Sequence, residues 1–304
     1  MANNPAVILI AHGSPESAAD VPAFMRNITS GRPVPPQVMQ EVQHRYNLIG
    51  RSPLSDLTRK QASQLRQSLD LPVYIGMRNW TPYIADTVAQ MVSDGITEVA
   101  AICLAPQNSR TSVGLYKRAL LAETAEEIKV HFIESWHDHP LLIRAFKEKL
   151  LPAWENARRG AGKDVQVIFT AHSVPAKTIE DGDPYESQTR ETAALVAAQL
   201  PALARNLWRF AFQSQGMSGG PGSWLGPTVE DTILALKAEG HNCVLIQPIG
   251  FLCDHVEVLY DIDVVFKRFA EDKGMQLTRT ESLNESPTLT AALADLSKRT
   301  LRLP

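Results

Sequence analysis

Residues 8–15 read ILIAHGSP and residues 168–175 read IFTAHSVP, two apolar runs that each end in Ala-His and a Ser/Pro turn. Such a run predicts a buried strand that places a histidine, His12 or His172, at its carboxyl end. In open α/β sheets ligands bind at this edge, because the loops there diverge while the sheet below stays rigid. Two such edges that face each other would form a cleft with a histidine on each wall.

Two further pairs of segments recur in the same order in both halves of the chain. GITEVAAICLAP (95–106) and GHNCVLIQP (240–248) are apolar runs that begin with Gly and end with Pro. IESWHDHPLLIRAF (133–146) and TESLNESPTLTAAL (280–293) each join a polar strand end to a helix that starts at Pro. A single pair of similar segments is common in α/β chains. Three pairs in register favour an internal duplication.

Strand-like and helical patterns alternate along the whole chain. The expected strands lie at about residues 6–11, 72–77, 97–105, 130–135, 164–171, 208–214, 243–249 and 276–280. The helical patterns between them predict parallel sheets that helices cover on both faces. We therefore expect an α/β protein of two domains, at residues 1–155 and 156–304, joined near the polar segment 155–164. A last helix from about Pro287 to Leu301 is free to pack on either domain.

The composition is that of a globular protein with reduced cysteines. Of 304 residues, 44% are hydrophobic and 21% are charged, and the net charge of −3 offers no bulk attraction to nucleic acid or to an anionic membrane. Cys103, Cys243 and Cys253 lack metal-binding spacing, which is typical of buried thiols in cytosolic proteins. No segment has the length of a membrane span and no signal peptide is evident, so we expect a cytoplasmic protein.

The region from Gly31 to Leu57 is a long excursion between the first two strands. Its GRPVPP stretch prevents a helix before Gln37, and an amphipathic run and the turn IGRSPL follow. An excursion of this length usually has a function, since its ordering costs entropy without extending the sheet. It carries side chains of the types that bind anions: Arg32, Arg45, Tyr46, Arg51 and Ser52. A solvated surface position explains each of these side chains equally well.

The segment PIGFLCDHVEVLYDID, residues 248–263, concentrates acidic side chains after a strand. Asp254 suits a helix N-cap and Glu257 the third helical position, so a capping box would explain both. Glu257 and Asp261 are four residues apart on one helix face, where like charges repel by roughly a few tenths of a kcal/mol. A cation between them, or protonation of one carboxyl, would relieve this repulsion. Together with His172 these carboxylates form a donor set that suits a first-row divalent metal.

Five segments together resemble the ferrochelatase family, in the order in which that family carries them. They are HRYNLIG and SPL (44–54), FTAHSVP (169–175), GDPY (182–185), WLGP (224–227) and PIGFLCDHVEVLYDID (248–263). The resemblance covers essentially the whole chain. It implies two Rossmann-like domains with parallel four-stranded sheets and a porphyrin cleft between them. The implied activity is insertion of ferrous iron into a free-base porphyrin in haem biosynthesis, with release of two protons.

The resemblance also implies small-molecule substrates, a porphyrin and ferrous iron, and a monomeric protein. We expect no tightly bound cofactor. Because the cysteine-containing C-terminal tail of some relatives is missing, we expect no iron–sulfur cluster either. The reaction needs an acceptor for the pyrrole N–H protons, which a neutral imidazole provides, and weak oxygen ligands that pass the iron inward.

Position by position, the resemblance assigns roles to the C-terminal half. His172 matches the family's active-site histidine and Glu257 the glutamate paired with it across the cleft, so both are expected to be catalytic and to contact the metal. Whether His172 acts as proton acceptor or metal ligand stays open. Asp261 is the next step of an acidic helix row and a further metal contact. The third step is Val265 here, and Asp263 replaces it only if a π-bulge rewinds the helix.

The porphyrin-binding residues fall in the N-terminal half. The excursion from Gly31 to Leu57 is similar to that of ferrochelatases that use coproporphyrin III, which carries four propionates. It lacks the longer apolar lip of ferrochelatases that use protoporphyrin IX. Arg45, Ser52 and Tyr116 match propionate-binding positions of that type. His12 stands where a tyrosine is expected, across the macrocycle from His172. It is expected either to ligate the iron of the product or to bond a loop carbonyl.

Some features leave alternatives open. An arginine expected before GR is Thr29 here, and the SLNESP segment (282–287) is closer to the protoporphyrin type. A cobalt or sirohydrochlorin-type chelatase is the alternative enzyme, since its first strand also ends in His-Gly-Ser, although it lacks WLGP and GDPY. A two-lobed binding protein that captures a metal or tetrapyrrole without chemistry is the alternative outside enzymes, but such a carrier would normally be exported.

Overall fold

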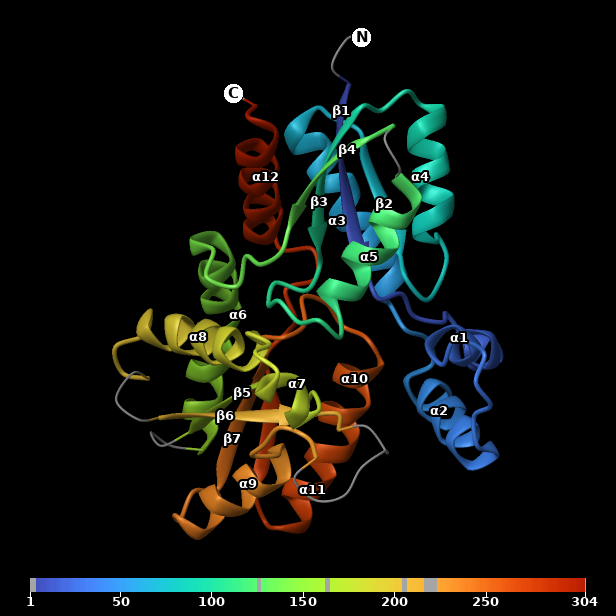
Figure 1. Ribbon diagram of the computed structural model, residues 1–304. Coiled ribbons are helices and arrows are strands. Elements are labelled where there is room, and N and C mark those ends of the chain that lie inside the picture. The colour runs from blue at the N-terminus through green and yellow to red at the C-terminus, as the bar shows by residue number, and fades with distance from the viewer. Residues whose placement is uncertain (1–3, 125–126, 162–164, 204–206, 216–222, 304) are drawn as a thin grey trace.

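The computed structural model describes residues 4–124, 127–161, 165–203, 207–215 and 223–303. It contains two parallel four-stranded sheets, ordered β2-β1-β3-β4 and β6-β5-β7-β8 (Figure 1). The strands are β1 (Pro5–Ala11), β2 (Val73–Met77), β3 (Glu98–Cys103), β4 (Lys129–Ile133), β5 (Gln166–His172), β6 (Trp208–Gln213), β7 (Cys243–Pro248) and β8 (Gln276–Arg279). All eight lie where the sequence predicts them, which confirms the α/β class with two parallel four-stranded sheets.

The central strand β1 shows why its sequence is apolar without interruption. It pairs with β2 on one side and β3 on the other, so its backbone is satisfied in both directions. Ile8 and Ile10 pack against α4 (Ile84–Ser93) and α5 (Val113–Thr124), whereas Val7 and Leu9 face the opposite side of the sheet. A strand that is buried on both faces cannot alternate apolar and polar residues, and it therefore reads as a continuous apolar run.

The remaining helices cover the sheets or stand at the domain junction. They are α1 (Val21–Ile28), α2 (Pro36–Ile49), α3 (Leu54–Leu69), α6 (Pro140–Ala161), α7 (Ala176–Glu180), α8 (Tyr185–Ala198), α9 (Val229–Ala238), α10 (Val256–Leu259), α11 (Lys267–Asp272) and α12 (Pro287–Leu301), with a 3-10 turn at Ala18–Asp20 and a π-helix at Asp261–Phe266. α2 lies in the excursion and α1 lies just before it, and both project beside the N-terminal sheet rather than covering it (Figure 1).

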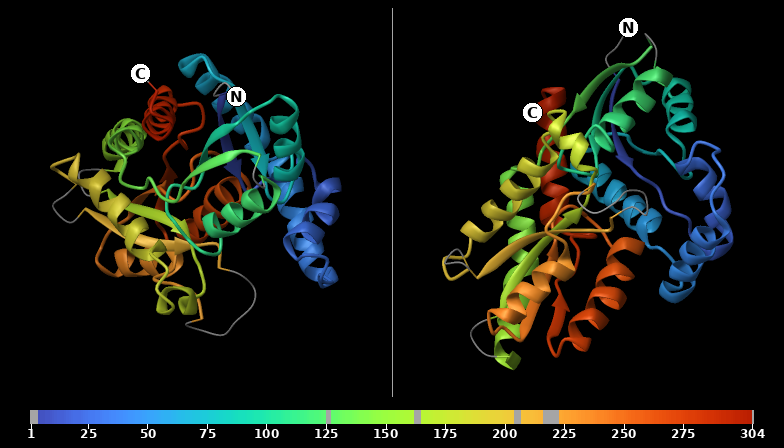
Figure 2. Two further views of the ribbon diagram at one scale, coloured as in Figure 1. Left: turned by 45° about the horizontal axis from the view of Figure 1, so that its top comes forward. Right: turned by 60° about the horizontal axis from the view of Figure 1, so that its bottom comes forward.

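The last helix crosses back to the N-terminal domain. α12 has the predicted bounds and packs against α3, α6 and β3, although it follows the last strand of the C-terminal sheet. Figures 1 and 2 show it alongside α6 and the N-terminal sheet. One continuous apolar core therefore includes Leu9 of β1, Phe169 of β5 and Leu293 of α12.

The polar segment 155–164, which the sequence predicts as the interdomain joint, continues α6 as far as Ala161. Residues 162–164 lie outside the described residues. The proposed boundary after residue 155 therefore falls inside a helix, and the two ranges stay a prediction. Among the residues that the structure describes, no helix is both long and apolar enough to cross a membrane.

Hydrogen bonds from the loop after β3 join the two domains. The Gln107 side-chain amide donates to the Ile249 carbonyl and to Thr192 Oγ1, both at 3.2 Å. Asp183, from the GDPY segment, is buried and accepts from the Arg110 backbone N–H at 2.6 Å and from Ser109 Oγ at 3.2 Å. These contacts fix the carboxyl end of the N-terminal sheet against the C-terminal domain.

Candidate active site

The carboxyl ends of β1 and β5 bring the two histidines of the repeated motif to the domain junction. His12 follows β1 directly and His172 is the last residue of β5. His12 lies close enough to His172 and to Glu257 for the charges of both to act on its pKa. Gly250, after β7, packs so tightly on β5 that a Cβ atom there would lie 2.8 Å from Ala171 Cβ. This close approach brings the segment after β7 beside His172.

His172 and Glu257 form the centre of the candidate site. Nε2 of His172 lies 3.5 Å from Oε1 of Glu257, and each side chain keeps about a third of its surface exposed, at 35% and 34%. Nδ1 of His172 donates to the carbonyl of Ser173, which fixes the ring and directs Nε2 toward the carboxylate. Glu257 is also 4.0 Å from Nε2 of His255. The pair is thus oriented and still accessible.

The pair carries charges of opposite sign. Desolvation alone would lower the pKa of His172, but the charge and hydrogen bond of Glu257 raise it to about 9. Desolvation opposes ionisation of Glu257 as well, and the charge of His172 nevertheless lowers its pKa to about 2. The ligand-free site therefore holds an imidazolium and a carboxylate at neutral pH. The Glu257 carboxylate thus opposes the neutral imidazole that proton acceptance requires, and this effect depends on a distance that the sequence does not reveal.

The capping box expected for Asp254 and Glu257 is absent from the structure. α10 begins at Val256, its N-cap is His255, and no side chain caps it. The Asp254 carboxylate instead accepts from Ser282 Oγ at 2.7 Å and from other donors of the segment after β8. Glu257 faces the histidines. The capping interpretation was wrong because tertiary partners compete successfully for both carboxylates.

Asp261 is buried at the start of the π-helix and links the two domains. It accepts from Ser214 Oγ at 2.5 Å and pairs with Nη1 of Arg45 at 3.4 Å. Burial raises the pKa of Asp261 to about 6, against the opposing effect of the Ser214 hydrogen bond. Arg45, on α2, also pairs with Glu41 at 3.1 Å and lies 5.0 Å from the ring centroid of Tyr260.

The π-helix rewinds the acidic row as the sequence hypothesis requires, but it does not supply the third acidic step. Both oxygens of Asp263 accept from the Arg279 guanidinium, at 2.8 and 2.9 Å. Val265 is 37% exposed and has no charge to contribute. Within the described residues, no group of three or more His, Cys, Asp or Glu side chains is arranged as a ready metal site. The metal contacts of His172, Glu257 and Asp261 stay a prediction.

The predicted porphyrin contacts lie on elements of the N-terminal domain. Ser52, just before α3, is 2% exposed, and its hydroxyl has no hydrogen-bond partner among the described residues. Tyr116, on α5, is buried at 4% exposure, and burial raises the pKa of its phenol. Arg51 pairs with Glu16 and Asp56 at the surface. The porphyrin contacts of His12, Arg45, Ser52 and Tyr116 stay a prediction.

His12 has a partner at each ring nitrogen. Nδ1 lies 2.9 Å from the carbonyl of Gly13, and Nε2 lies 3.0 Å from the side-chain nitrogen of Asn79. A carbonyl can only accept, so Nδ1 carries the proton and Nε2 accepts from Asn79. Desolvation by the surrounding residues lowers the pKa of His12, which keeps it neutral. Of the two expected roles, the structure supports the hydrogen bond to a loop carbonyl.

Sequence reasoning missed three residues of this site. Gln213 ends β6 and donates to the Glu257 carbonyl at 3.0 Å, and Ser214, the next residue, binds Asp261. Asn79 follows β2 and orients His12. All of them follow strands, so the edge rule that found His12 and His172 applies to β2 and β6 as well.

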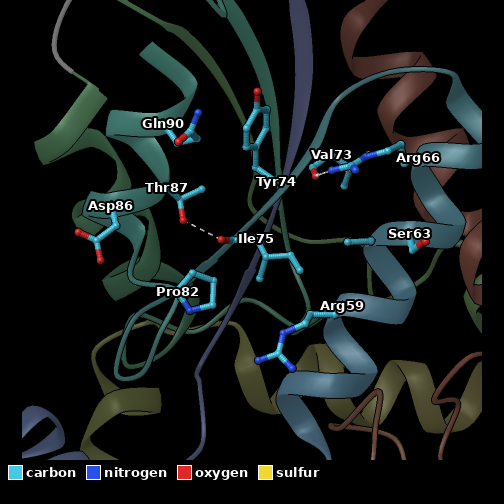
Figure 3. A pocket seen from close by; sticks show the side chains of 11 residues that line it. Arg59, Ser63, Arg66, Val73, Tyr74, Ile75, Pro82, Asp86, Thr87 and Gln90 are labelled. Carbon is cyan, nitrogen blue, oxygen red and sulfur yellow. Dashed lines mark hydrogen bonds between the residues drawn. The ribbon is translucent and has the colours of Figure 1, made fainter. Parts of the chain in front are cut away.

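A pocket of about 470 Å³ lies elsewhere, at the edge strand β2 between α3 and α4 (Figure 3). Two of its polar side chains bond the strand: Arg66 donates to the Val73 carbonyl at 2.8 Å and Thr87 to the Ile75 carbonyl at 2.7 Å. They satisfy carbonyls that an edge strand leaves open. None of the candidate site residues lines this pocket.

Two α/β domains meet at their strand ends, around a histidine–carboxylate pair. Solved structures share this fold. One is SirB from Bacillus subtilis with Fe3+, with a TM-score of 0.59 and 10% identity, covering 98% of this chain and 95% of that one. Another is the sirohydrochlorin chelatase SirB from Bacillus subtilis subspecies spizizenii in complex with cobalt, with a TM-score of 0.55 and 12% identity, covering 98% and 96%.

The family model described as Ferrochelatase matches residues 4–301, and the chain belongs to the ferrochelatase family. It is 53% identical to a ferrochelatase of Acidobacterium capsulatum, over 98% of this chain and 95% of that protein. It is 37% identical to a ferrochelatase of Deinococcus radiodurans (96% and 95%) and 35% identical to a coproporphyrin III ferrochelatase of Bacillus subtilis (95% and 95%). Membership of this family makes it an enzyme of haem biosynthesis that inserts iron into a porphyrin, which decides against the alternative chelatases and the binding protein.

Proposed function

We propose that this ferrochelatase inserts ferrous iron into coproporphyrin III, with His172 and Glu257 as its catalytic residues. The observation that carries the proposal is the placement of this charged pair, 3.5 Å apart, where the two sheets meet. The N-terminal side contributes Arg45 and Ser52, a cation and an unpartnered hydroxyl suited to carboxylates. One side of the site therefore suits metal and proton chemistry and the other suits propionates.

The charge of the pair suggests an order of events. A dication that approaches Glu257 disfavours the neighbouring imidazolium, so His172, whose side chain is 35% exposed, releases its Nε2 proton to solvent water as iron arrives. The freed Nε2 then accepts a pyrrole proton from the porphyrin. Glu257 and Asp261 offer oxygen ligands that hold the iron weakly and release it to four pyrrole nitrogens. The two pyrrole protons leave the macrocycle in exchange for the two charges of the metal.

The choice of porphyrin rests on carboxylate partners. Coproporphyrin III carries four propionates and protoporphyrin IX carries two. Arg45 is held by Glu41 and Asp261 in the ligand-free protein, so a propionate must exchange with one of them. The Ser52 hydroxyl has no hydrogen-bond partner to exchange among the described residues, but it is buried, so a propionate reaches it only when the surrounding side chains shift. Relatives named coproporphyrin III ferrochelatase support this preference.

We propose further that the protein is a cytoplasmic monomer without a resident cofactor or iron–sulfur cluster. Its three cysteines are free and buried. Cys103 lies on β3 in the N-terminal domain, whereas Cys243 and Cys253 lie in the C-terminal domain. This arrangement supports reduced thiols rather than cluster ligands. Iron and acid-labile sulfide analysis of the purified protein tests the cluster, and light scattering tests the oligomeric state.

The substrate is tested by initial rates with both porphyrins, in wild type, Arg45→Ala and the control Arg51→Ala. Wild type should show a higher kcat/KM for coproporphyrin III. Arg45→Ala should raise the Michaelis constant for coproporphyrin III more than for protoporphyrin IX, because a charge-assisted hydrogen bond contributes about 1.5–3 kcal/mol. Arg45 pairs with Asp261 of the candidate site, whereas Arg51 pairs with the surface carboxylates Glu16 and Asp56, so the Arg51 variant should match wild type. Equal effects of Arg45→Ala on both porphyrins would contradict the assignment.

A further inference from the structure

The segment that carries Glu257 has little helical structure of its own. α10 spans only four residues, Val256–Leu259, its N-cap makes no side-chain cap, and a π-helix follows directly. Short helices are marginal without tertiary packing, and π-helical turns are rare insertions in α-helices. The position of Glu257 therefore depends on contacts from outside the segment.

Arg279, the last residue of β8, supplies such contacts on both sides of Glu257. Its Nε and Nη2 donate to the two oxygens of Asp263, at 2.8 and 2.9 Å. Its Nη1 donates to Oδ1 of Asp254 at 3.2 Å and to the Thr280 carbonyl at 2.8 Å. The side chain is only 14% exposed. A planar guanidinium with bidentate partners fixes geometry as well as charge.

The segment after β8 holds Asp254 from a second direction and connects it to the N-terminal domain. Nδ2 of Asn284 donates to Oδ2 of Asp254 at 2.8 Å, and the Asp254 N–H donates to Oδ1 of Asn284 at 2.9 Å. Asn284 has a φ of 46°, in the left-handed region that asparagine tolerates. Its carbonyl accepts from the Gln61 side chain of α3 at 2.7 Å. The support of Glu257 thus reaches across the domain junction.

We propose that Arg279 is a positioning residue for iron insertion, which holds Asp254 and Asp263 so that the Glu257 carboxylate stays against Nε2 of His172. Arg279 makes no contact with Glu257 itself and acts only through the backbone between its two partners. The inference rests on the proposed catalytic roles of His172 and Glu257. A displacement of about 1 Å in such a constellation can cost up to about a hundredfold in rate.

The test compares kcat and both Michaelis constants for wild type, Arg279→Gln, Arg279→Lys and a control. The control is Arg209→Gln, which removes the 2.9 Å ion pair of β6 with Glu239 on the same domain and should keep the wild-type kcat. Arg279→Gln should lower kcat about tenfold or more and change the porphyrin Michaelis constant less than about twofold. Arg279→Lys keeps the charge without the bidentate geometry, so its kcat should lie between those of wild type and Arg279→Gln. Rates are measured well below each variant's Tm.

If Arg279→Gln does not fold, Asp263→Asn decides, because it weakens one partner and leaves the Arg279–Asp254 contact in place. It should lower kcat severalfold with the same unchanged porphyrin Michaelis constant. A kcat equal to that of Arg209→Gln in folded Arg279→Gln, or in Asp263→Asn, overturns the inference even if Tm falls. A wild type that inserts no iron would instead contradict the proposed function, so the two failures are distinguishable.

Discussion

Glu257 sets the charge of His172, and this coupling has a defined pH dependence. The carboxylate raises the pKa of His172 to about 9 against the desolvation that lowers it. A histidine with a raised folded-state pKa contributes stability that is fully present below its unfolded value of about 6.5. This contribution is lost as the pH rises through about 9.

We predict that Glu257→Gln lowers the pKa of His172 to its ordinary value or below, because desolvation then acts without the compensating charge. At pH values between the lowered pKa of the variant and the wild-type pKa of about 9, the His172 imidazole is charged in wild type and neutral in the variant. NMR titration of the histidine ring protons measures the His172 midpoint in both proteins, with His137, which pairs with Glu191, as internal reference. An unchanged His172 midpoint would show that Glu257 does not control it.

Asn79 contacts the ring nitrogen of His12 that a metal would need. Nε2 of neutral His12 accepts from Asn79, so the lone pair that would ligate iron is occupied. We predict that Asn79→Ala frees this nitrogen and lets it coordinate the iron of the product, since neutral imidazole is a good ligand for first-row metals. Absorption and resonance Raman spectra of the haem complex should then differ between variant and wild type. The double variant Asn79→Ala, His12→Gln should lose the difference, and a persisting difference would assign it to another ligand.

At the scale of elements, the close packing of β5 on the turn after β7 holds His172 in place. A Cβ atom at Gly250 would lie 2.8 Å from Ala171 Cβ and 3.0 Å from Ala171 Cα, and backbone cannot yield as a flexible side chain does. We predict that Gly250→Ala lowers the free energy of unfolding by about 1–3 kcal/mol and reduces kcat, because the strand end must shift. Gly160→Ala in α6 meets nothing within 4 Å and should be neutral or stabilising. Equal denaturation midpoints for the two variants would contradict this account.

The sequence predicts the strands and the last helix because their periodicity is local. It does not predict the turn around Glu257, where Asp254 and Glu257 match a capping box but bond elsewhere. The deciding partner is Arg279, which lies 25 residues beyond Asp254 along the chain. Helix geometry that depends on such a distant ion pair leaves no periodic signal. From the sequence, a π-bulge could be named only as the condition under which Asp263 would take the place of Val265 in the acidic row.

At the scale of the whole molecule, the repeated strand–histidine motif predicts that two strand edges carry the site, and the structure brings His12 and His172 to one junction. The sequence left open which domain α12 covers. Its apolar face suits either sheet, and only the packing against α3 and α6 decides. The charge of the His172–Glu257 pair also escaped prediction, since a pKa depends on distances between residues that are remote in sequence.

The central claim is that this chain inserts ferrous iron into a porphyrin and that His172 is required for it. Anaerobic loss of coproporphyrin III fluorescence on addition of Fe2+ measures this directly, in wild type and in His172→Ala, with porphyrin affinity and Tm measured in parallel. The account predicts multiple turnovers for wild type. It predicts loss of insertion for His172→Ala, with porphyrin affinity and Tm close to wild type. A wild type that does not metalate, or a variant that keeps most of its turnover, would contradict the account.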